Sequence, residues 1–275
     1  MGRTIAIING EQYWHSYFPG DEVIYRRIQD CAWVLRDGEL WCIDREAATR
    51  LDGVLWRVGA IRPQERYRTA LEIIRLSGVP CVNPAEVLLR GFERLSMLAE
   101  LRAAGLKTIS FDVATGDDMA RRLGRNFPLV VKAGNHHGGY GKARVQDNES
   151  WGDVADLLFA VEEYVTVEPY IDYRRDVRCL AVGDRYWAME REGRGWKANV
   201  DTRKYRLIEP PEVLVQQTRA AMTHLRADTL ALDFLEKEDG EFVALESNDT
   251  PGYSGFPDEV RAALANCLKQ RLGAA

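Results

Sequence analysis

Four glycines gather in one turn between two short apolar segments, and this turn constrains the fold more than any other feature. The apolar pattern predicts a buried strand over Pro128–Ala133, which ends with Lys132 and Ala133. It predicts a second strand over Ala143–Val145, which leaves the turn. Glycines let backbone N–H groups approach an anion, and Lys132 would present a fixed cation to it. The turn joins strand to strand without a GxxxxGKS/T pattern, so neither a Walker A loop nor a Rossmann turn fits. It therefore predicts either a phosphate-binding hairpin or only a flexible one.

Three further residues indicate a metal site. Asp233 and Glu246 belong to two apolar strand patterns that a turn at Asp239-Gly240 would pair as a hairpin. Residues i and i+2 of a strand share a face, so Glu246 and Asn248 are expected to point the same way. Two carboxylates and an amide oxygen are hard ligands that suit Mg²⁺ bridging to substrate phosphates. The alternative is a solvated sheet edge, although unpaired carboxylates inside apolar strands would be costly.

The chain divides into three segments, and the first, 1–88, reads as a small parallel α/β lobe. Strands are expected at Thr4–Asn9, Asp52–Arg57 and Pro80–Asn83. Between the last two strands, apolar residues recur at helical spacing from Arg66 to Ser77, and Gly78 stops the helix. Strand–helix–strand order of this kind is typical of a parallel sheet.

The other two segments, 89–170 and 171–275, contain the glycine turn and the proposed metal ligands, respectively. The second segment has expected helices near 92–101 and 151–160 and a strand over 164–170. The third is rich in strands and ends with a helix over 258–272, which carries apolar residues on one face.

Composition limits the classes of protein to consider. The 275 residues are 46% hydrophobic and 29% charged with a formal net charge of −5, which is typical of a globular protein. Basic residues are dispersed, so no nucleic-acid partner is expected. Five scattered cysteines without CxxC spacing favour a reducing compartment, and no apolar run is long enough to span a membrane. We expect a cytoplasmic protein with no membrane partner.

Taken in chain order, several motifs resemble the ATP-grasp superfamily, most closely the branch of the ribosomal-protein glutamate ligase, the LysW-type amino-acid ligases and the peptide-macrocyclising ligases. The glycine loop also resembles that of synapsins. The likeness spans about residues 83–257. Its motifs are Lys132 with the glycine loop, Val167-Glu168-Pro169-Tyr170-Ile171, Asp176-Val177-Arg178, Ala188-Met189-Glu190-Arg191, Asn199, Asp233 and Glu246-Ser247-Asn248.

The resemblance implies a fold and three regions. The fold class is α/β with α+β lobes, in which ATP lies between two α+β subdomains that follow an N-terminal parallel α/β lobe. Residues 1–88 would form the pre-ATP-grasp lobe, 89–170 the central subdomain with the glycine loop, and 171–275 the C-terminal subdomain with the Mg²⁺ site.

The resemblance also implies roles in binding ATP and metal. Lys132 would contact the α- and β-phosphates while the loop containing Gly138, Gly139 and Gly141 closes over the triphosphate. Glu168, Tyr170 and Ile171 belong to the strand that would bind adenine, and Asp176 would bind the ribose hydroxyls. Asp233, Glu246 and Asn248 would hold two Mg²⁺ ions, for which Mn²⁺ is a substitute.

The catalytic roles follow the same resemblance. Arg178 and Arg191 would clamp the transferred phosphate and the acyl group, and Asn199 would help to hold them. The family often has Asp-Lys at the start of the central helix where this chain has Glu93-Arg94, so Arg94 would neutralise phosphate with a planar guanidinium.

The implied activity is that of an ATP-dependent ligase joining a carboxylate to an amine through an acyl-phosphate, with an amino acid or peptide as substrate. Two alternatives stay open: an ATP-binding regulatory or scaffold protein similar to synapsin, and a phosphotransferase in which a hydroxyl attacks ATP. A homo-oligomer, either a dimer or a tetramer, also stays open.

Some residues suggest contacts with the substrates. Arg57 follows a parallel strand at its carboxyl end, which makes it a candidate for binding a substrate carboxylate. Trp196 lies in a polar stretch and is either a substrate contact or part of the core, and His136 and His137 lie at the tip of the glycine turn. Six cations over 190–210 either attract an acidic substrate or form a solvated basic loop: Arg191, Arg194, Lys197, Arg203, Lys204 and Arg206.

Overall fold

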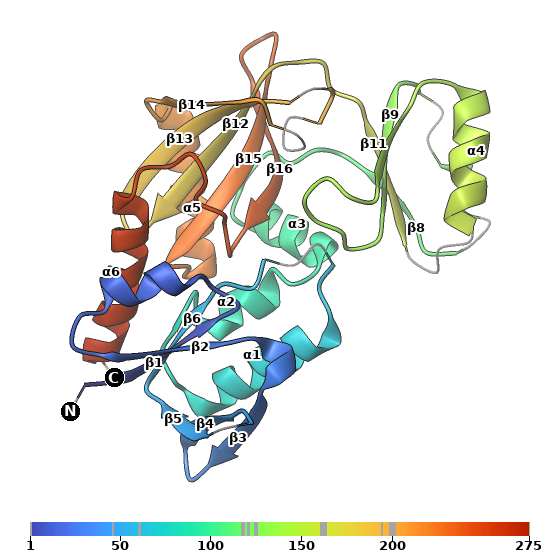
Figure 1. Cartoon of the computed structure of the whole chain (residues 1–275). Helices are drawn as coiled ribbons and strands as arrows, with labels where there is room; N and C mark the ends of the chain where they lie inside the picture. Colours follow the sequence, from blue (N-terminus) through green and yellow to red (C-terminus); the bar gives the residue numbers. More distant parts are fainter. Residues whose placement is uncertain are drawn as a thin grey trace.

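The computed structural model describes residues 2–45, 47–59, 62–116, 119, 122–123, 126–159, 164–193, 195–197 and 202–274. Four sheets organise these residues (Figure 1). Each of the three larger sheets lies within one of the predicted segments, although the segment boundaries themselves stay a prediction. None of the helices in the described residues is long and apolar enough to cross a membrane.

The N-terminal sheet is parallel, as the sequence predicts. Its strand order is β2 (Glu22–Arg26), β1 (Thr4–Ile8), β6 (Gly53–Trp56) and β7 (Cys81–Val82). Helix α1 (Glu65–Ser77) ends at Gly78, whose φ of 70° lies in the left-handed region that a side chain disfavours. The predicted strand–helix–strand lobe is therefore confirmed.

Side-chain alternation along β1 gives this sheet two apolar faces. Ala6 and Ile8 pack with α1 and α2 (Ala85–Arg90), while Ile5 and Ile7 pack with α6 (Glu259–Ala274). Because α6 also packs against the C-terminal sheet, it joins the two parts of the molecule in one core.

A small antiparallel sheet at the edge of the lobe was not predicted. It consists of β3 (Ala32–Arg36), β4 (Glu39–Ile43) and β5 (Ala48–Leu51). Two 3₁₀ helices, η1 (Gln12–Tyr17) and η2 (Ile28–Asp30), also lie in this region.

The central sheet has the order β10 (Lys142–Val145), β9 (Leu129–Ala133), β11 (Val165–Pro169) and β8 (Asp112–Ala114). The predicted glycine hairpin is confirmed, because β9 and β10 pair in antiparallel register. Helix α4 (Asn148–Phe159) covers one face, where Trp151 packs with apolar residues such as Val131 and Val167. Alternation then turns Lys132 and Glu168 to the opposite face.

The C-terminal sheet has the order β14 (Lys204–Ile208), β13 (Arg185–Glu192), β12 (Tyr173–Val182), β15 (Thr229–Lys237) and β16 (Phe242–Asn248). One face packs against α3 (Arg94–Ala103) and α5 (Glu212–Leu225) through apolar side chains. Both predicted hairpins are present, although β14, α5 and the full lengths of the strands were not predicted. The other face carries the charged side chains of the candidate site and, farther along, packs on α6.

A single buried asparagine ties the N-terminal lobe to the C-terminal sheet. Asn83 follows β7 and is 1% exposed. Its Nδ2 donates to the carbonyl oxygens of Thr229 (2.8 Å) and Asp249 (2.7 Å). Its Oδ1 accepts from the backbone N–H groups of Asp228 (2.7 Å) and Thr229 (2.9 Å). The side chain thus satisfies four backbone groups of a buried connection.

We expect Asn83→Ala to lower the free energy of unfolding by roughly 2–4 kcal/mol, because it leaves buried backbone groups without partners. Urea denaturation of both proteins measures this change. Asn266→Ala, at an exposed position of α6, is the matched control and should change stability by less than about 0.5 kcal/mol. Equal small effects of the two substitutions would contradict the role of Asn83.

Candidate functional site

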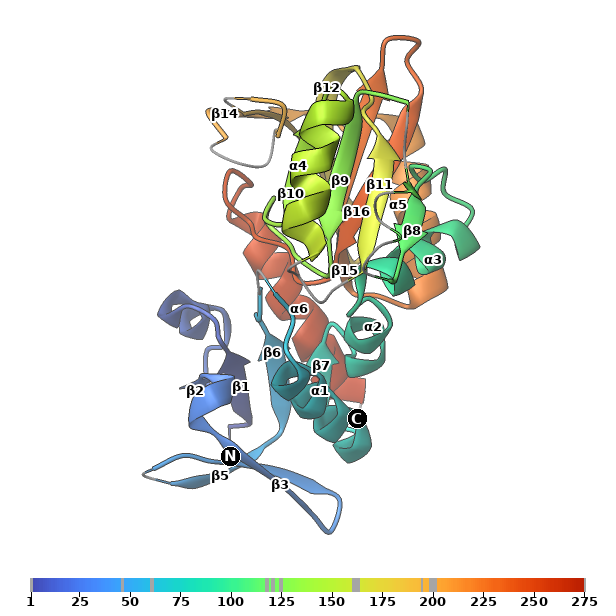
Figure 2. The ribbon, with the colours of Figure 1, turned by 90° about the vertical axis from the view of Figure 1, so that its right-hand side faces the viewer.

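Two charged sheet faces meet at one pocket. Lys132 and Glu168 approach from the central sheet, and Asp176, Arg191, Asp233 and Glu246 approach from the C-terminal sheet. Figure 2 shows β9 and β11 in front of β15 and β16, and Figure 1 shows the two sheets side by side. The structure thus brings together residues that lie up to 114 positions apart in the sequence, from 132 to 246.

The central sheet contributes a buried ion pair. Lys132 and Glu168 are 6% and 2% exposed, and the Lys132 Nζ donates to Glu168 Oε1 at 2.6 Å. Burial lowers the pKa of Lys132 to about 8, and Glu168 only partly opposes that change. Glu168, which lies on the strand expected to bind adenine, therefore binds Lys132 in this structure.

Cross-strand partners form an ionic ladder on the C-terminal sheet. Asp176 on β12 is the register partner of Arg191 on β13, and Arg191 Nε donates to Asp176 Oδ1 at 2.7 Å. Arg178 on β12 is the register partner of Asp233 on β15, and its Nε and Nη2 donate to the two carboxylate oxygens at 2.7 and 2.8 Å. Arg191 Nη1 also reaches Asp233 Oδ2 at 3.2 Å, which links both pairs.

Burial acts on both carboxyl groups of this ladder, but their pKa values move in opposite directions. Burial raises the pKa of Asp176, and the nearby Asp233 charge adds to this effect while Arg191 opposes it. Burial also raises the pKa of Asp233, but Arg178 and Arg191 outweigh it and hold that pKa below its usual value. Of the two carboxyl groups, Asp233 therefore keeps its negative charge to lower pH than Asp176.

Glu246 is the register partner of Asp233 on β16 and lies among cations. Lys142 Nζ and Arg94 Nη1 are 3.6 and 3.7 Å from its Oε2. Burial by itself raises the pKa of Glu246. The positive charges of Lys142, Arg94 and Lys132 outweigh this effect and hold the pKa well below its usual value, so the carboxylate stays ionised. Arg94 is 2% exposed, and its Nε and Nη1 have no hydrogen-bond partner among the described residues. Buried donors without partners next to excess positive charge fit an anionic ligand such as a polyphosphate.

The glycine loop is held in place from two sides. Its glycines all have positive φ, namely 52°, 66°, 82° and 62° at Gly134, Gly138, Gly139 and Gly141. From α3, the Arg94 backbone N–H donates to Asn135 Oδ1 (3.0 Å), and Arg94 Nη2 donates to the His136 carbonyl (2.8 Å). From the other side, Lys197 Nζ donates to the carbonyls of Gly139 and Lys142, both at 2.9 Å.

The donor set of the predicted metal site fits Mg²⁺. Asp233 and Glu246 are register partners on the neighbouring strands β15 and β16. Glu246 and Asn248 line a common cavity, as expected for positions i and i+2 of one strand. Within the described residues, no group of three or more His, Cys, Asp or Glu side chains is placed to hold a metal. A metal here would therefore depend on two carboxylates, the Asn248 amide oxygen and oxygens of a bound ligand.

The outer part of the pocket is apolar and aromatic. Val130, Ile171, Tyr173, Leu235 and Leu245 line it beyond the ion pairs. Tyr170 and Trp196 stand edge to face with ring centroids 6.4 Å apart, and Arg144 lies over the Tyr170 ring at 4.3 Å. Trp196 therefore lies beside this pocket, and the slot suits a flat ring attached to an anionic chain.

Several sequence expectations need correction. Arg57 donates to the Pro251 carbonyl (2.8 Å) and to Tyr253 Oη (3.3 Å), so its guanidinium is used in packing rather than presented to a substrate. Among the six cations of 190–210, Lys204 and Arg206 pair with Glu192 and Glu190. The described cations of this region therefore form no single basic surface. Arg194 and Asn199 lie outside the described residues.

Two residues of the site were not assigned a role from the sequence. Lys142 ends the glycine loop and is the register partner of Lys132, so hairpin pairing alone places it beside the first lysine. His137 lines the cavity next to Asn248, and burial lowers its pKa, which keeps the ring neutral near pH 7. Beyond it, burial raises the pKa of the Asp249 carboxyl to about 7.

The chain resembles known proteins over most of its length. A family model described as "Synapsin, ATP binding domain" matches residues 118–210. The glutamate–LysW ligase ArgX of Sulfolobus acidocaldarius is 24% identical over 217 residues, which are 72% of this chain and 75% of that protein.

Solved structures share its whole fold. A RiPP-associated ATP-grasp ligase of Chryseobacterium gregarium, in complex with ADP and a leader and core peptide, superposes with a TM-score of 0.72 at 15% identity, covering 98% of this chain and 97% of that one. D-alanyl-alanine synthetase A of Vibrio cholerae gives a TM-score of 0.75 at 15% identity and covers 99% of each chain. The chain has the fold of the ATP-grasp proteins. The predicted fold is thus confirmed, and the site lies between two of its sheets.

The ionic ladder predicts a large stability effect. Arg178→Met should lower the free energy of unfolding by about 3–5 kcal/mol, because it removes two bonds from Asp233, whose side chain is 2% exposed. Arg185→Met is the control, since Arg185 pairs with Glu259 at the surface with 49% and 51% exposure. That loss should stay within about 1 kcal/mol. Chemical denaturation measures both, and similar losses would contradict the ladder's importance.

Proposed function

We propose that this ATP-grasp protein is an ATP-dependent ligase that joins a carboxylate to an amine through an acyl-phosphate. The observation that carries the proposal is the cluster of Arg94, Lys132 and Lys142 around Glu246, beside the ladder of Arg178 and Arg191. This cluster offers cations to a triphosphate on one side and two guanidinium groups to a reacting anion on the other. The names of the similar proteins, a glutamate–LysW ligase and a D-alanyl-alanine synthetase, support the same reaction class.

The pocket has an apolar part that would hold adenine and a cationic part that would hold the phosphates of ATP. Adenine would lie among Val130, Tyr170, Ile171 and Leu235, against the backbone of β11. Lys132, released from part of its pairing with Glu168, would contact the inner phosphates. The loop with Gly138, Gly139 and Gly141 would close over the outer phosphates, and a closed loop protects a reactive acyl-phosphate from water. Asp176 lies at the ribose end, where ribose hydroxyls would compete with Arg191 for its oxygens.

The metal ligands would be Asp233, Glu246 and Asn248. When bound there, Mg²⁺ supplies positive charge that offsets the phosphate oxygens. Arg178 and Arg191 already hold both oxygens of Asp233, so they fix this carboxylate's orientation before any ligand arrives. The same arginines lie beside the cavity that Glu246 and Asn248 line, where the acyl group would react.

The reaction then proceeds in two steps. A substrate carboxylate oxygen attacks the γ-phosphorus of ATP, the bond from that phosphorus to the bridging oxygen breaks, and ADP leaves. The amine nitrogen attacks the acyl carbon, the bond to the phosphate oxygen breaks, and phosphate leaves while the nitrogen loses protons to phosphate and solvent. Arg178 and Arg191 would stabilise the charge that grows on the transferred group in both steps.

A second candidate is an ATP-binding protein without ligase turnover. The match of the synapsin ATP-binding model to residues 118–210 favours it, because this range includes the glycine loop. Both candidates bind ATP, so only product formation separates them.

The lowered pKa of Lys132 predicts pH-dependent nucleotide binding. In the free protein Lys132 has a pKa of about 8, whereas a nearby phosphate favours the charged form and raises it. Binding therefore takes up a proton above pH 8, and affinity for Mg-ADP should fall by up to about tenfold per pH unit between pH 8 and 9.5. Lys132→Arg stays charged and should flatten this dependence. Calorimetric titrations would contradict the assignment if both proteins showed the same slope.

The ligase step predicts a specific defect for Arg191→Lys. We expect kcat to fall by about 10²-fold, as for loss of one donor to a developing oxyanion, while affinity for Mg-ADP changes little. The measurement is hydroxamate formation from ATP, hydroxylamine and a panel of amino acids and other carboxylates. Lys204→Arg, on the exposed strand β14, is a control that should keep wild-type rates. Tight Mg-ADP binding with no hydroxamate from any carboxylate would favour the non-ligase candidate, and a phosphorylated hydroxyl product would indicate a phosphotransferase.

A further inference from the structure

A second cavity of about 280 Å³ lies between the N-terminal lobe and the end of β16. It shares Gly138 and Asn248 with the cavity that Arg178, Arg191 and Glu246 line. The two cavities are therefore neighbours, and the glycine loop contributes to the walls of both. A molecule in the second cavity would lie beside the proposed centre of phosphate transfer.

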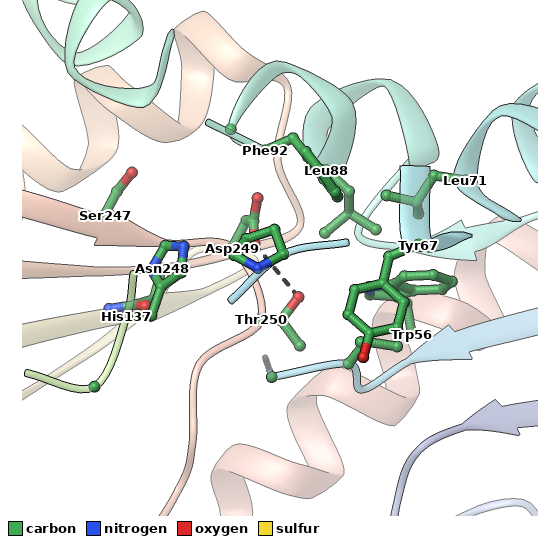
Figure 3. Close-up of a pocket in the computed structure, with 15 residues that line it drawn as sticks. Trp56, Tyr67, Leu71, Leu88, Phe92, His137, Ser247, Asn248, Asp249 and Thr250 are labelled. Atoms are coloured by element: carbon green, nitrogen blue, oxygen red, sulfur yellow. Dashed lines mark hydrogen bonds between the residues drawn. The ribbon is translucent and has the colours of Figure 1, made fainter. Parts of the chain in front are cut away.

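The walls of this cavity differ in chemistry (Figure 3). One wall is apolar and consists of Trp56, Tyr67, Leu71, Leu88 and Phe92 from β6, α1, α2 and the turn after α2. The other wall carries His137, Ser247 and Asn248. Figure 3 shows Asp249 between the two walls.

Asp249 lacks a cationic partner in the described chain. Its Oδ1 accepts a long bond from Thr250 Oγ1 (3.4 Å), and no lysine or arginine occurs among the described residues of the lining. Two nearby arginines are held elsewhere: Arg57 by Pro251 and Tyr253, and Arg68 over the Phe92 ring at 5.0 Å. A carboxylate beside an apolar wall is costly until a cation pairs with it.

The carboxylate lies close to Gly91, which also lines the cavity. A Cβ atom on Gly91 would come within 2.7 Å of Asp249 Oδ2, so any side chain there would force the carboxylate to shift. The φ of Gly91 is −87°, so its backbone does not require a glycine there. The missing side chain therefore allows Asp249 to take this position in the cavity wall.

We propose that this cavity binds the amine substrate, and that the substrate is a cationic amine carried on an aromatic or branched apolar body. Asp249 would bind the ammonium group, and the wall of Trp56, Tyr67 and Phe92 would cover the apolar body. Asp249 is thus a specificity-determining residue that also disfavours a second carboxylate near the amine. This inference rests on the proposed ligase function, because the bound amine is a substrate only if the protein is a ligase. The binding preference itself is independent of turnover.

The test compares two probes of the same shape, phenethylamine and 3-phenylpropionate, by calorimetry with the full chain in the presence of Mg-ADP. The wild type should bind phenethylamine at least about tenfold more tightly, because only the amine pairs with Asp249. Asp249→Asn should remove this preference and weaken amine binding by about tenfold or more. Asp239→Asn, at the exposed hairpin turn between β15 and β16, is the matched control and should keep both affinities.

Gly91→Ala provides a second variant that leaves every charge in place. It should weaken phenethylamine binding, because the added methyl group would clash with Asp249 Oδ2 and displace the carboxylate. A wild type that prefers 3-phenylpropionate, or an Asp249→Asn variant with unchanged amine affinity, would overturn the inference.

The outcomes separate this inference from the proposed function. Selective amine binding that depends on Asp249, together with no hydroxamate from any carboxylate, would overturn the ligase proposal and support the binding site. Hydroxamate formation together with an amine affinity that Asp249→Asn leaves unchanged would overturn the binding site and leave the ligase proposal standing.

Discussion

The pairing of Asp233 with Arg178 and Arg191 is the interaction on which the rest of the site depends. Asp233 on β15 accepts hydrogen bonds from Arg178 on β12 and from Arg191 on β13, so one buried carboxylate joins three strands. Burying such a charge would be unfavourable alone, and two guanidinium groups compensate for it through three hydrogen bonds. These bonds let the C-terminal sheet hold charged residues at its centre. The opposite face of the sheet packs on α3 and α5 through apolar side chains.

The part of the site around Glu246 has an excess of positive charge. Around Glu246, the cations Arg94, Lys132 and Lys142 exceed the carboxylates within reach, and in the described part of the chain two nitrogens of Arg94 have no hydrogen-bond partner. A site of this kind is stable as a scaffold but electrostatically incomplete, and a polyanion would complete it. The glycine loop is tied to the same residues through Arg94 and Lys197, so binding at the phosphate end and closure of the loop would be coupled.

The sequence predicted what depends on local pattern. Glycines at a hairpin tip, the strand that leads into that hairpin and the i, i+2 relation of Glu246 and Asn248 each follow from local pattern, and the structure has all three. Pairings that depend on register could not be read from one chain, since a one-residue shift turns each side chain to the other face. For this reason Arg191 with Asp176, and Glu168 with Lys132, became visible only in the fold. The sheet β3–β5 was missed because its strands are only four or five residues long and their sequences do not alternate regularly between polar and apolar residues.

The central claim is that ATP activates a carboxylate by transferring its γ-phosphoryl group to a carboxylate oxygen. The most direct measurement follows oxygen atoms, using the carboxylate substrate labelled with ¹⁸O in both oxygens and mass spectrometry of the phosphate released with the amide. Attack on the γ-phosphorus predicts one ¹⁸O atom in each phosphate, because the acyl carbon–oxygen bond breaks in the second step. Phosphate without label, formed together with the amide, would contradict the account.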